Sequence, residues 1–410
     1  MRLFLLLIFT VLSIFESEAQ RNLYHPLQQR KRVDIPFEFH NNFIIIDLVF
    51  DKRLPLKFIF DTGAEHTILA KKEIAEAVGM KYDRAFKLLG ADLRTELVAY
   101  LTRNVHLKMG ELSMSNLDIL VLGEDYFDFE AYTGVLVHGI LGANIFKRFV
   151  VRINYQKKVI SFIHPNSFNP PQKFQELPIS IERNKPYIQA NVELQNQTQV
   201  PVKLLLDSGA SLNLLLHNDT DSTLQLPERV IPGNIGRGLG GFLEGFLGRI
   251  GRLELGEEQF SFDNIVTSFQ ELSSPGDSSR NLVPRNGIIG NIIMSRFTVV
   301  IDYIHEKLYL KARKNYNKGF KYDKSGLVLI ATGARLSDFI VSDVVKGSPA
   351  EQIDIRKDDR IIRLNWIPSG FLNLDLITRK LQGRSGKTVT LIIKRGRKRI
   401  KKKITLRDLI

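Results

Sequence analysis

One short acidic motif occurs twice in this 410-residue chain, each time at the end of an apolar run. Residues 54–64 read LPLKFIFDTGA and residues 200–210 read VPVKLLLDSGA, so the two aspartates are 146 positions apart (207 − 61). Each apolar run that ends in such a turn predicts a strand. The repeated motif indicates an internal duplication of the chain. Two lobes related by an approximate twofold axis are expected to bring Asp61 and Asp207 face to face.

Two neighbouring carboxyl groups have a specific chemical use. When they are close together they cannot both ionise, so they share one proton. The ionised carboxylate takes a proton from a bound water, and the protonated carboxyl group donates a hydrogen bond to a peptide carbonyl. The pair supplies a base and an acid together and needs no metal.

A second repeated element supports the duplication. Residues 139–142 (GILG) return as residues 287–290 (GIIG), now 148 positions apart (290 − 142), and similar strands follow both copies. Together with the aspartate motifs, this element resembles the aspartic protease superfamily over residues 33–313. The Asp-Thr-Gly-Ala-x-x-Thr form at residues 61–67 is closer to retropepsins, whereas two copies in one chain is the pepsin arrangement. In that family the apolar-apolar-Gly element packs behind the catalytic loop.

The resemblance implies a role for each residue of the two motifs. The aspartates hold the catalytic water, the hydroxyl residues tie the two loops together through hydrogen bonds to backbone, and the glycines leave room for N–H groups to approach the carboxylates. The implied catalytic residues are Asp61 and Asp207, and the implied supporting residues are Thr62, Gly63, Ser208 and Gly209. No metal and no cofactor is expected, because the chain has no cysteine and no His-Glu-x-x-His sequence.

The residues after the two motifs depart from the pepsin pattern. Pepsins usually have Ser or Thr where this chain has Ala64 and Ala210. One fewer hydrogen bond to the ionised carboxylate raises the pKa of the pair. We therefore expect a pH optimum less acidic than that of gastric pepsins. The second copy also has Asn213 where the first has Thr67, so the surroundings of the two motifs are expected to differ.

The family closes its cleft with a hairpin flap. In the second lobe the glycine-rich stretch 233–251 suits a mobile hairpin, and in the first lobe the candidate is 88–103. Tyr100 is either a flap tyrosine or a core-facing strand residue.

The C-terminal part of the chain resembles a PDZ domain. The resemblance rests on Gly-Ser-Pro-Ala at residues 347–350, followed by Asp-x-Ile-x-x-Leu-Asn at residues 359–365. Residues 374–381 predict a short amphipathic helix, and residues 388–394 and 399–406 predict a closing hairpin. In such a domain a loop of backbone N–H groups binds a peptide carboxylate and the ligand adds a strand to the sheet edge. The candidate loop consists of Ser325, Gly326, Leu327 and Val328. The alternative is a PDZ fold that only packs on the protease.

These patterns predict a mainly β chain with two pseudo-symmetric retropepsin/pepsin-like β-barrel lobes and an α+β PDZ domain. The expected units are a signal peptide at 1–19, protease lobe 1 at 33–163, an interlobe linker at 164–178, protease lobe 2 at 179–313 and the PDZ domain at 323–408. The linker is marked by its prolines, and a basic, polar stretch at 311–324 joins lobe 2 to the PDZ domain.

The N-terminus and the charge indicate the compartment. Residues 3–15 are almost wholly apolar, follow Arg2 and precede small residues, which predicts a cleaved signal peptide and a mature chain from Gln20. We expect export to the periplasm or the exterior, with a bacterial envelope as the setting. The net charge of +14 is concentrated at residues 394–403, where a solvated hairpin is expected. Weak association with an anionic envelope surface is expected, and binding of nucleic acid is not.

The sequence therefore predicts an exported aspartic endopeptidase. Its partners are a polypeptide substrate in the interlobe cleft and a C-terminal peptide on the PDZ domain, which recruits polypeptides or regulates access. The alternative is a non-catalytic envelope protein that binds peptides with the same cleft and PDZ surface. A third hypothesis is an envelope scaffold held by the basic tail.

Overall fold

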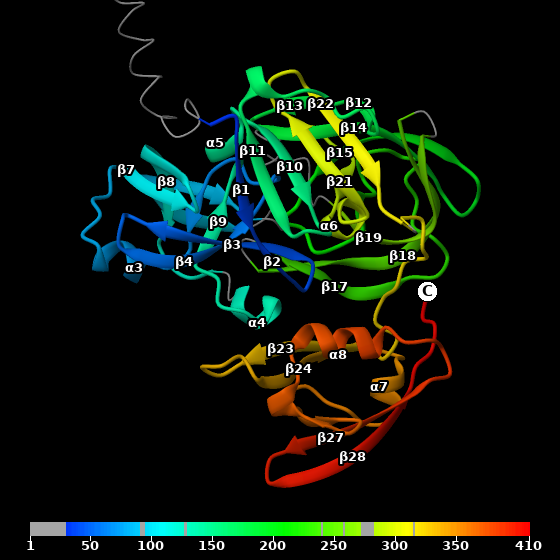
Figure 1. Cartoon of the computed structure of the whole chain (residues 1–410). Helices are drawn as coiled ribbons and strands as arrows, with labels where there is room; N and C mark the ends of the chain where they lie inside the picture. Colours follow the sequence, from blue (N-terminus) through cyan, green and yellow to red (C-terminus); the bar gives the residue numbers. More distant parts are fainter. Residues whose placement is uncertain are drawn as a thin grey trace, which may run out of the picture.

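A computed structural model describes residues 30–90, 95–126, 129–238, 241–256, 259–271, 283–314 and 316–410. The predicted signal peptide at 1–19 lies outside these residues. The chain is mainly β, as predicted, with two protease-like lobes and a C-terminal domain (Figure 1). No helix in the described part of the chain is both long and apolar enough to cross a bilayer.

The first lobe is built on an eight-stranded sheet with the order β2-β3-β4-β9-β5-β8-β7-β6. Its strands are β2 (Glu38–His40), β3 (Phe43–Phe50), β4 (Leu54–Phe60), β5 (Ile68–Leu69), β6 (Ala85–Leu89), β7 (Glu96–Met109), β8 (Leu112–Leu122) and β9 (Gly139–Leu141). The short helices α3 (Lys72–Ala77), α4 (Phe129–Thr133) and α5 (Ala143–Phe146) lie between or after these strands. The sheet ends on one side in the β6–β7 hairpin, which the sequence predicted as a flap.

The second lobe repeats the first strand for strand. Its eight-stranded sheet has the order β13-β14-β15-β20-β16-β19-β18-β17, so every strand corresponds to the lobe 1 strand numbered eleven lower. The strands are β13 (Ser180–Glu182), β14 (Lys185–Glu193), β15 (Gln199–Leu206), β16 (Leu214–His217), β17 (Ile231–Gly238), β18 (Gly241–Leu255), β19 (Phe260–Gln270) and β20 (Gly287–Ile289). Helix α6 (Asn291–Met294) follows β20 as α5 follows β9. The duplication seen in the sequence therefore extends over both sheets.

A six-stranded sheet joins the two lobes. Its order is β1-β11-β10-β21-β22-β12, with three strands from each copy. The strands are β1 (Arg32–Pro36), β11 (Val159–Ile163), β10 (Val150–Asn154), β21 (Phe297–Asp302), β22 (Lys307–Ala312) and β12 (Gln175–Pro178). The copies meet where β10 pairs antiparallel with β21, from Val150 opposite Asp302 to Asn154 opposite Thr298. The pseudo-twofold axis passes through this junction.

The stretch that its prolines marked as an interlobe linker is partly structured. It contains the 3-10 turn Pro165–Ser167 and ends in β12, which pairs with β22. Pro178 is tolerated in β12 because this strand lies at the edge of the sheet, where a missing N–H breaks no ladder. The crossing between the lobes is thus attached to the shared sheet.

The alternation of apolar and polar residues explains how the strands face one core. In β1 the burial alternates along the strand, with Val33 and Ile35 inside and their neighbours exposed. In the central strands β4 and β15 the last three residues are all buried, as expected for strands covered on both faces. The resulting apolar core runs without a break through both lobes and the shared sheet.

The C-terminal domain has its own apolar core. Its sheet has the order β23-β24-β25-β27-β28, and β26 pairs with β25. The elements are β23 (Leu327–Thr332), β24 (Asp338–Val344), α7 (Pro349–Gln352), β25 (Arg360–Leu364), β26 (Ile367–Pro368), η3 (Ser369–Phe371), α8 (Leu374–Leu381), β27 (Thr388–Arg395) and β28 (Lys398–Thr405). The helix predicted at 374–381 and the closing hairpin are both present. Asn373 caps α8 by accepting a hydrogen bond from the N–H of Leu376 at 2.8 Å.

The stretch between lobe 2 and the C-terminal domain carries buried aromatic residues. Phe320 and Tyr322 pack into the protease core, and the Arg296 guanidinium lies 3.7 Å from the centroid of the Phe320 ring. The Tyr322 hydroxyl accepts hydrogen bonds from the backbone N–H groups of Leu409 at 2.6 Å and Ile410 at 3.2 Å. The predicted basic, polar connection is therefore docked on lobe 2 along part of its length.

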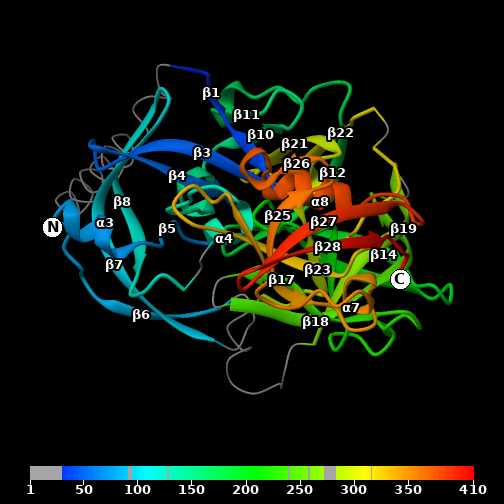
Figure 2. The same ribbon diagram turned by 90° about the horizontal axis from the view of Figure 1, so that it is seen from below.

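The C-terminal domain also contacts lobe 1. Helix α4 packs against β23, and the two views show α4 beside β23 and α8 (Figures 1 and 2). A methyl group placed on Gly134, just after α4, would lie 3.3 Å from Cβ of Leu374, the first residue of α8. Both lobes thus hold the C-terminal domain in place.

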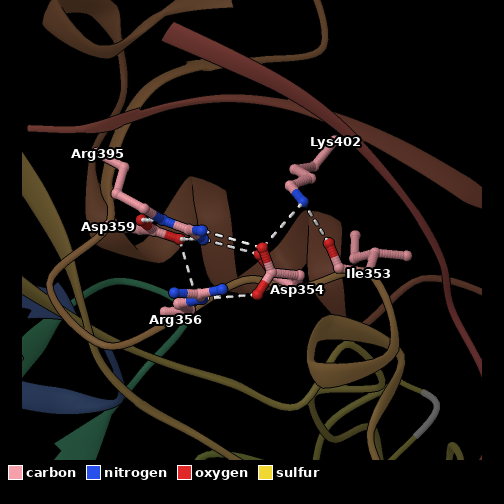
Figure 3. Close-up of polar contacts among 6 residues, drawn as sticks. All are labelled: Ile353, Asp354, Arg356, Asp359, Arg395 and Lys402. Carbon is pink, nitrogen blue, oxygen red and sulfur yellow. Dashed lines mark hydrogen bonds and ion pairs between the residues drawn. The ribbon is translucent and has the colours of Figure 1, made fainter. Parts of the chain in front are cut away.

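A cluster of charged side chains lies beside the β27–β28 hairpin of the C-terminal domain (Figure 3). The Asp359 carboxylate is almost fully buried and accepts hydrogen bonds from the Arg395 guanidinium at 2.7 and 2.8 Å. Arg395 also bonds Asp354 at 3.0 Å. Asp354 and Asp358 have φ values of 56° and 70°, a left-handed conformation that aspartate tolerates. The cluster holds a strained loop against β27.

This cluster gives the first prediction. Replacing Arg395 by Met leaves the buried Asp359 carboxylate without its cation, and we expect the free energy of unfolding to fall by about 3 kcal/mol. Chemical denaturation followed by circular dichroism measures the change. The control is Arg397→Met, an exposed position in the same hairpin. Equal stability of the two variants would contradict the prediction.

Candidate active site

The two predicted catalytic aspartates follow equivalent strands. Asp61 comes directly after β4 and Asp207 directly after β15, and each of these strands is parallel to a short neighbour, β9 or β20. The N–H of Asp61 donates to the Leu141 carbonyl at 3.1 Å, and the N–H of Asp207 donates to the Ile289 carbonyl at 3.0 Å. The repeated apolar-apolar-Gly element therefore supports both aspartate loops, as the resemblance implied.

Two hydroxyl groups tie the loops together across the pseudo-twofold axis. The Thr62 hydroxyl donates to the Leu206 carbonyl at 2.7 Å and accepts from the N–H of Ser208 at 3.0 Å. The Ser208 hydroxyl donates to the Phe60 carbonyl at 2.8 Å and accepts from the N–H of Thr62 at 3.0 Å. Both side chains are fully buried. The structure thus places these residues where the resemblance put them, with four reciprocal hydrogen bonds.

The glycines of the motifs have a further role. A methyl group on Gly63 would lie 2.5 Å from Cγ of Asp207, and one on Gly209 would lie 2.3 Å from Cγ of Asp61. Carbon atoms do not approach so closely without displacement of one of them. Each glycine therefore makes room for the aspartate of the other lobe as well as for its own backbone N–H.

The two carboxyl groups are within hydrogen-bonding reach of each other but are not equivalent. Asp61 Oδ1 accepts from the N–H groups of Gly63 at 2.7 Å and Ala64 at 3.1 Å, whereas Asp207 Oδ1 accepts from Gly209 at 2.8 Å. Removal from water raises the pKa of both groups, and the neighbouring Asp207 raises that of Asp61 further, well above its usual range. The hydrogen bond from Asp61 lowers the pKa of Asp207. The pair therefore keeps one shared proton to a higher pH than two isolated carboxyl groups would.

Residues around the two loops differ, as the sequence indicated. Thr67 donates through its hydroxyl to Asn144 Oδ1 at 2.9 Å and accepts from the N–H of Gly142 at 3.1 Å. At the equivalent place in lobe 2, Asn213 donates to the Val266 carbonyl at 2.9 Å instead. The second loop is therefore supported by an amide in place of a hydroxyl.

The aspartates lie at the bottom of a cleft of about 490 Å³ between the lobes. This volume is in the range of sites that bind small molecules or side chains. Both predicted flap hairpins line it, the first through Leu88 and Leu89 and the second through Ile235 and Leu243. Tyr100 instead lies against Tyr82, with ring centroids 5.1 Å apart. The cleft therefore has one hairpin from each lobe.

Several polar residues of the cleft wall were not predicted from the sequence, and three of them on the lobe 2 side are basic. Lys185, Arg285 and His217 line the cleft on the lobe 2 side. Burial, followed by the nearby Arg285, lowers the pKa of Lys185 and lowers the pKa of His217 to about 3, so the imidazole is neutral. None belongs to a motif; only alignment of the two copies strand by strand singles them out.

The candidate carboxylate loop of the C-terminal domain already binds a carboxylate of its own. Asp323 Oδ1 accepts from the N–H groups of Ser325 at 2.8 Å and Gly326 at 2.9 Å. The N–H of Leu327 bonds the Ser325 hydroxyl at 3.2 Å, and Val328 lies in β23, at the edge of the sheet. A peptide carboxylate at this loop would have to replace Asp323.

The part of the chain that the structure describes has no group of three His, Asp or Glu side chains placed to hold a metal ion.

Comparisons with known proteins agree with this architecture. Residues 46–145 match the family model described as aspartyl protease, and residues 340–395 match that described as PDZ domain. No curated protein matches the chain. The protein combines an aspartyl protease domain with a C-terminal PDZ domain, which confirms the expected domain types.

The raised pKa of Asp61 gives a prediction for stability. A carboxyl group whose pKa is higher in the folded chain stabilises fully below its unfolded pKa of about 4, and this contribution is lost as the pH rises through the folded pKa. Asparagine at position 61 cannot ionise. We therefore expect the melting temperature of Asp61→Asn to rise relative to that of the unmodified chain as the pH increases from 4 to 8.

Thermal unfolding at a series of pH values measures this difference. The control is Asp219→Asn, at an exposed position in lobe 2. Melting temperatures of Asp61→Asn that run parallel to those of the unmodified chain across this range would contradict the pKa assignment.

Proposed function

We propose that this protein is an exported aspartic endopeptidase that hydrolyses peptide bonds through a water held by Asp61 and Asp207. The observation that carries the proposal is the reciprocal binding of two buried hydroxyl groups, which holds two carboxyl groups of raised pKa together in a cleft. The match to the aspartyl protease family supports it.

Because the two carboxyl groups share one proton, one acts as the base and the other as the acid, and we assign the base to Asp207 and the acid to Asp61. Asp207, ionised, takes a proton from the water as the water oxygen attacks the carbonyl carbon of the substrate. Asp61, protonated, gives its proton to the carbonyl oxygen, so a neutral tetrahedral diol forms. The proton on Asp207 then passes to the amide nitrogen, and Asp61 recovers its proton from a diol hydroxyl as the C–N bond breaks. An acid and an amine leave, and both aspartates return to their first states.

The setting of this reaction remains a proposal from the sequence. The predicted signal peptide at 1–19 supports export to the periplasm or the exterior of a bacterial cell. The exposed lysines and arginines of the β27–β28 hairpin, such as Arg399, Lys401 and Lys403, support weak association with an anionic envelope surface.

The endopeptidase proposal is tested by cleavage of a peptide library across pH with the mature chain from Gln20. We expect cleavage that falls by at least about a thousandfold in Asp61→Asn and in Asp207→Asn, because each variant loses the acid or the base. Asp219→Asn is the control. Mass spectrometry identifies the products.

The alternative function, a peptide-binding protein without hydrolysis, makes the opposite prediction. If no peptide is cleaved at any pH while both variants still fold and bind the same peptides, the endopeptidase proposal is wrong and the binding function takes its place.

We propose that the PDZ domain regulates access to the cleft. Helix α4 packs on β23, the edge strand where a PDZ ligand is added, and two residues of the α4 helix, Phe129 and Tyr132, line the cleft. The Tyr132 carbonyl accepts a hydrogen bond from Asn41, another cleft residue, at 2.7 Å. A ligand that displaces α4 from β23 therefore alters the cleft wall.

Removal of Asp323 tests this regulation. In Asp323→Ala the N–H groups of Ser325 and Gly326 are free, so we expect tighter binding of peptides with a free C-terminal carboxylate, and no gain for the same peptides amidated. We also expect bound peptide to raise KM for a cleft substrate, because α4 moves. Fluorescence anisotropy and cleavage rates measure the two effects, and Asp343→Ala, exposed in the same domain, is the control. Peptide binding that leaves KM unchanged would contradict regulation and favour recruitment.

A further inference from the structure

The two walls of the cleft are built at equivalent positions by different side chains. Strands β3 and β14 occupy the same place in the two eight-stranded sheets. Ile45, the third residue of β3, pairs with Ile59, which lies two positions before Asp61. Tyr187, the third residue of β14, pairs with Leu205, which lies two positions before Asp207. The first residues of the strands, Phe43 and Lys185, are therefore equivalent, and both line the cleft.

A second pair of equivalent positions is defined by hydrogen bonds. His138 Nδ1 accepts a hydrogen bond from the backbone N–H of Lys57 in β4 at 3.0 Å. Asn286 Oδ1 accepts one from the backbone N–H of Lys203 in β15 at 2.9 Å, and these two lysines are 146 positions apart (203 − 57). The residues immediately before them, Val137 and Arg285, are therefore equivalent. A hydrophobic residue in lobe 1 corresponds to a cation in lobe 2.

A third pair follows from the same backbone segments. The N–H of Ala70 donates to the His138 carbonyl at 2.8 Å, and the N–H of His217 donates to the Asn286 carbonyl at 2.7 Å. Ala70 is apolar and buried, whereas both ring nitrogens of His217 are buried without a hydrogen-bond partner among the described residues.

At the lobe 1 positions, Phe43 and Val137 are apolar and pack against other apolar side chains. Phe43 and Val137 pack with Ile45 and Ile59 in one buried apolar cluster. Because Phe43 lines the cleft, this part of the lobe 1 wall presents hydrocarbon to a ligand. It suits an apolar side chain of a ligand.

At the equivalent lobe 2 positions, Lys185 and Arg285 are cations. Lys185 and Arg285 form no salt bridge with any carboxylate in the described part of the chain, and Arg285 Nε is buried without a hydrogen-bond partner. The charges that face Lys185 are those of Asp207, Glu65 and two arginines. Glu65 lies 3.7 Å from His66, and both Lys185 and Arg285 lower the pKa of Asp207 across the cleft. Both side chains are partly buried at the cleft wall, so a ligand carboxylate forms charge-assisted hydrogen bonds with them with little competition from water.

We propose that the cleft selects polypeptides that place an acidic side chain, aspartate or glutamate, against Lys185 and Arg285 and an apolar side chain against the Phe43 wall. This inference rests on the proposed function for its substrate and adds the substrate class. Lys185 and Arg285 determine specificity in it; Asp61 and Asp207 perform the chemistry.

The test compares peptides that differ at one position. Each residue of a cleaved peptide is replaced in turn by Glu, Gln and Lys, and kcat/KM is measured. At one position we expect Glu to exceed Gln by at least about tenfold, since a hydrogen bond between charged groups is worth about 1.5–3 kcal/mol. Lysine should be the poorest. The same peptides are bound to Asp61→Asn by fluorescence anisotropy, so that the preference is also measured without turnover.

The test variants replace Lys185 and Arg285 by the residues found at the equivalent positions of lobe 1. In Lys185→Phe/Arg285→Val the ratio of Glu to Gln should fall to about one, and Arg285→Gln provides a milder second variant if the double one fails to fold. Lys307→Met, which removes a cation paired with Glu176 outside the cleft, should keep the ratio.

The outcomes separate this inference from the proposed function. Cleavage with the same rate for Glu, Gln and Lys, or with a ratio unchanged in the variants, would overturn the inference and leave the endopeptidase intact. Absence of cleavage, with binding that prefers Glu and loses this preference in the variants, would overturn the endopeptidase and support the acidic-side-chain site.

Discussion

The exchange of two hydroxyl groups across the pseudo-twofold axis is the contact on which the site depends. The hydroxyl groups of Thr62 and Ser208 each bond the backbone of the opposite lobe, and they are fully buried, so no water can replace a lost partner. They hold Asp61 and Asp207 within reach of each other. Their proximity and their burial raise the pKa of the pair, so the two carboxyl groups share one proton.

Much of the site follows from the sequence because its residues belong to repeated motifs. The roles of Thr62 and Ser208 and the pairing of the aspartates follow from the repeat and the resemblance. The approach of Gly63 and Gly209 to the opposite aspartates does not, because it depends on how two distant segments meet. The α8 helix was predicted because its apolar spacing is local.

The roles of Lys185, Arg285 and Asp323 could not be predicted from the sequence either, because they also depend on how separate segments meet in the fold. Lys185 and Arg285 lie at offsets of 142 (185 − 43) and 148 (285 − 137) from their lobe 1 equivalents, since loops of different length separate the repeated strands. No single offset aligns them with the aspartates at 146 (207 − 61). Asp323 precedes the candidate carboxylate loop, but only the folded backbone shows that it occupies the loop.

Duplication within one chain has a consequence for how such a cleft changes over evolutionary time. In a protease made of two identical subunits, one codon specifies both walls, so each replacement at the cleft appears twice. Here every strand of the first lobe's sheet has a counterpart in the second lobe that is numbered eleven higher along the chain and is encoded separately. One half can therefore keep hydrocarbon at a position where the other acquires a cation, as at Phe43 and Lys185. The shared sheet and the hydroxyl exchange keep the halves in register while their surfaces diverge.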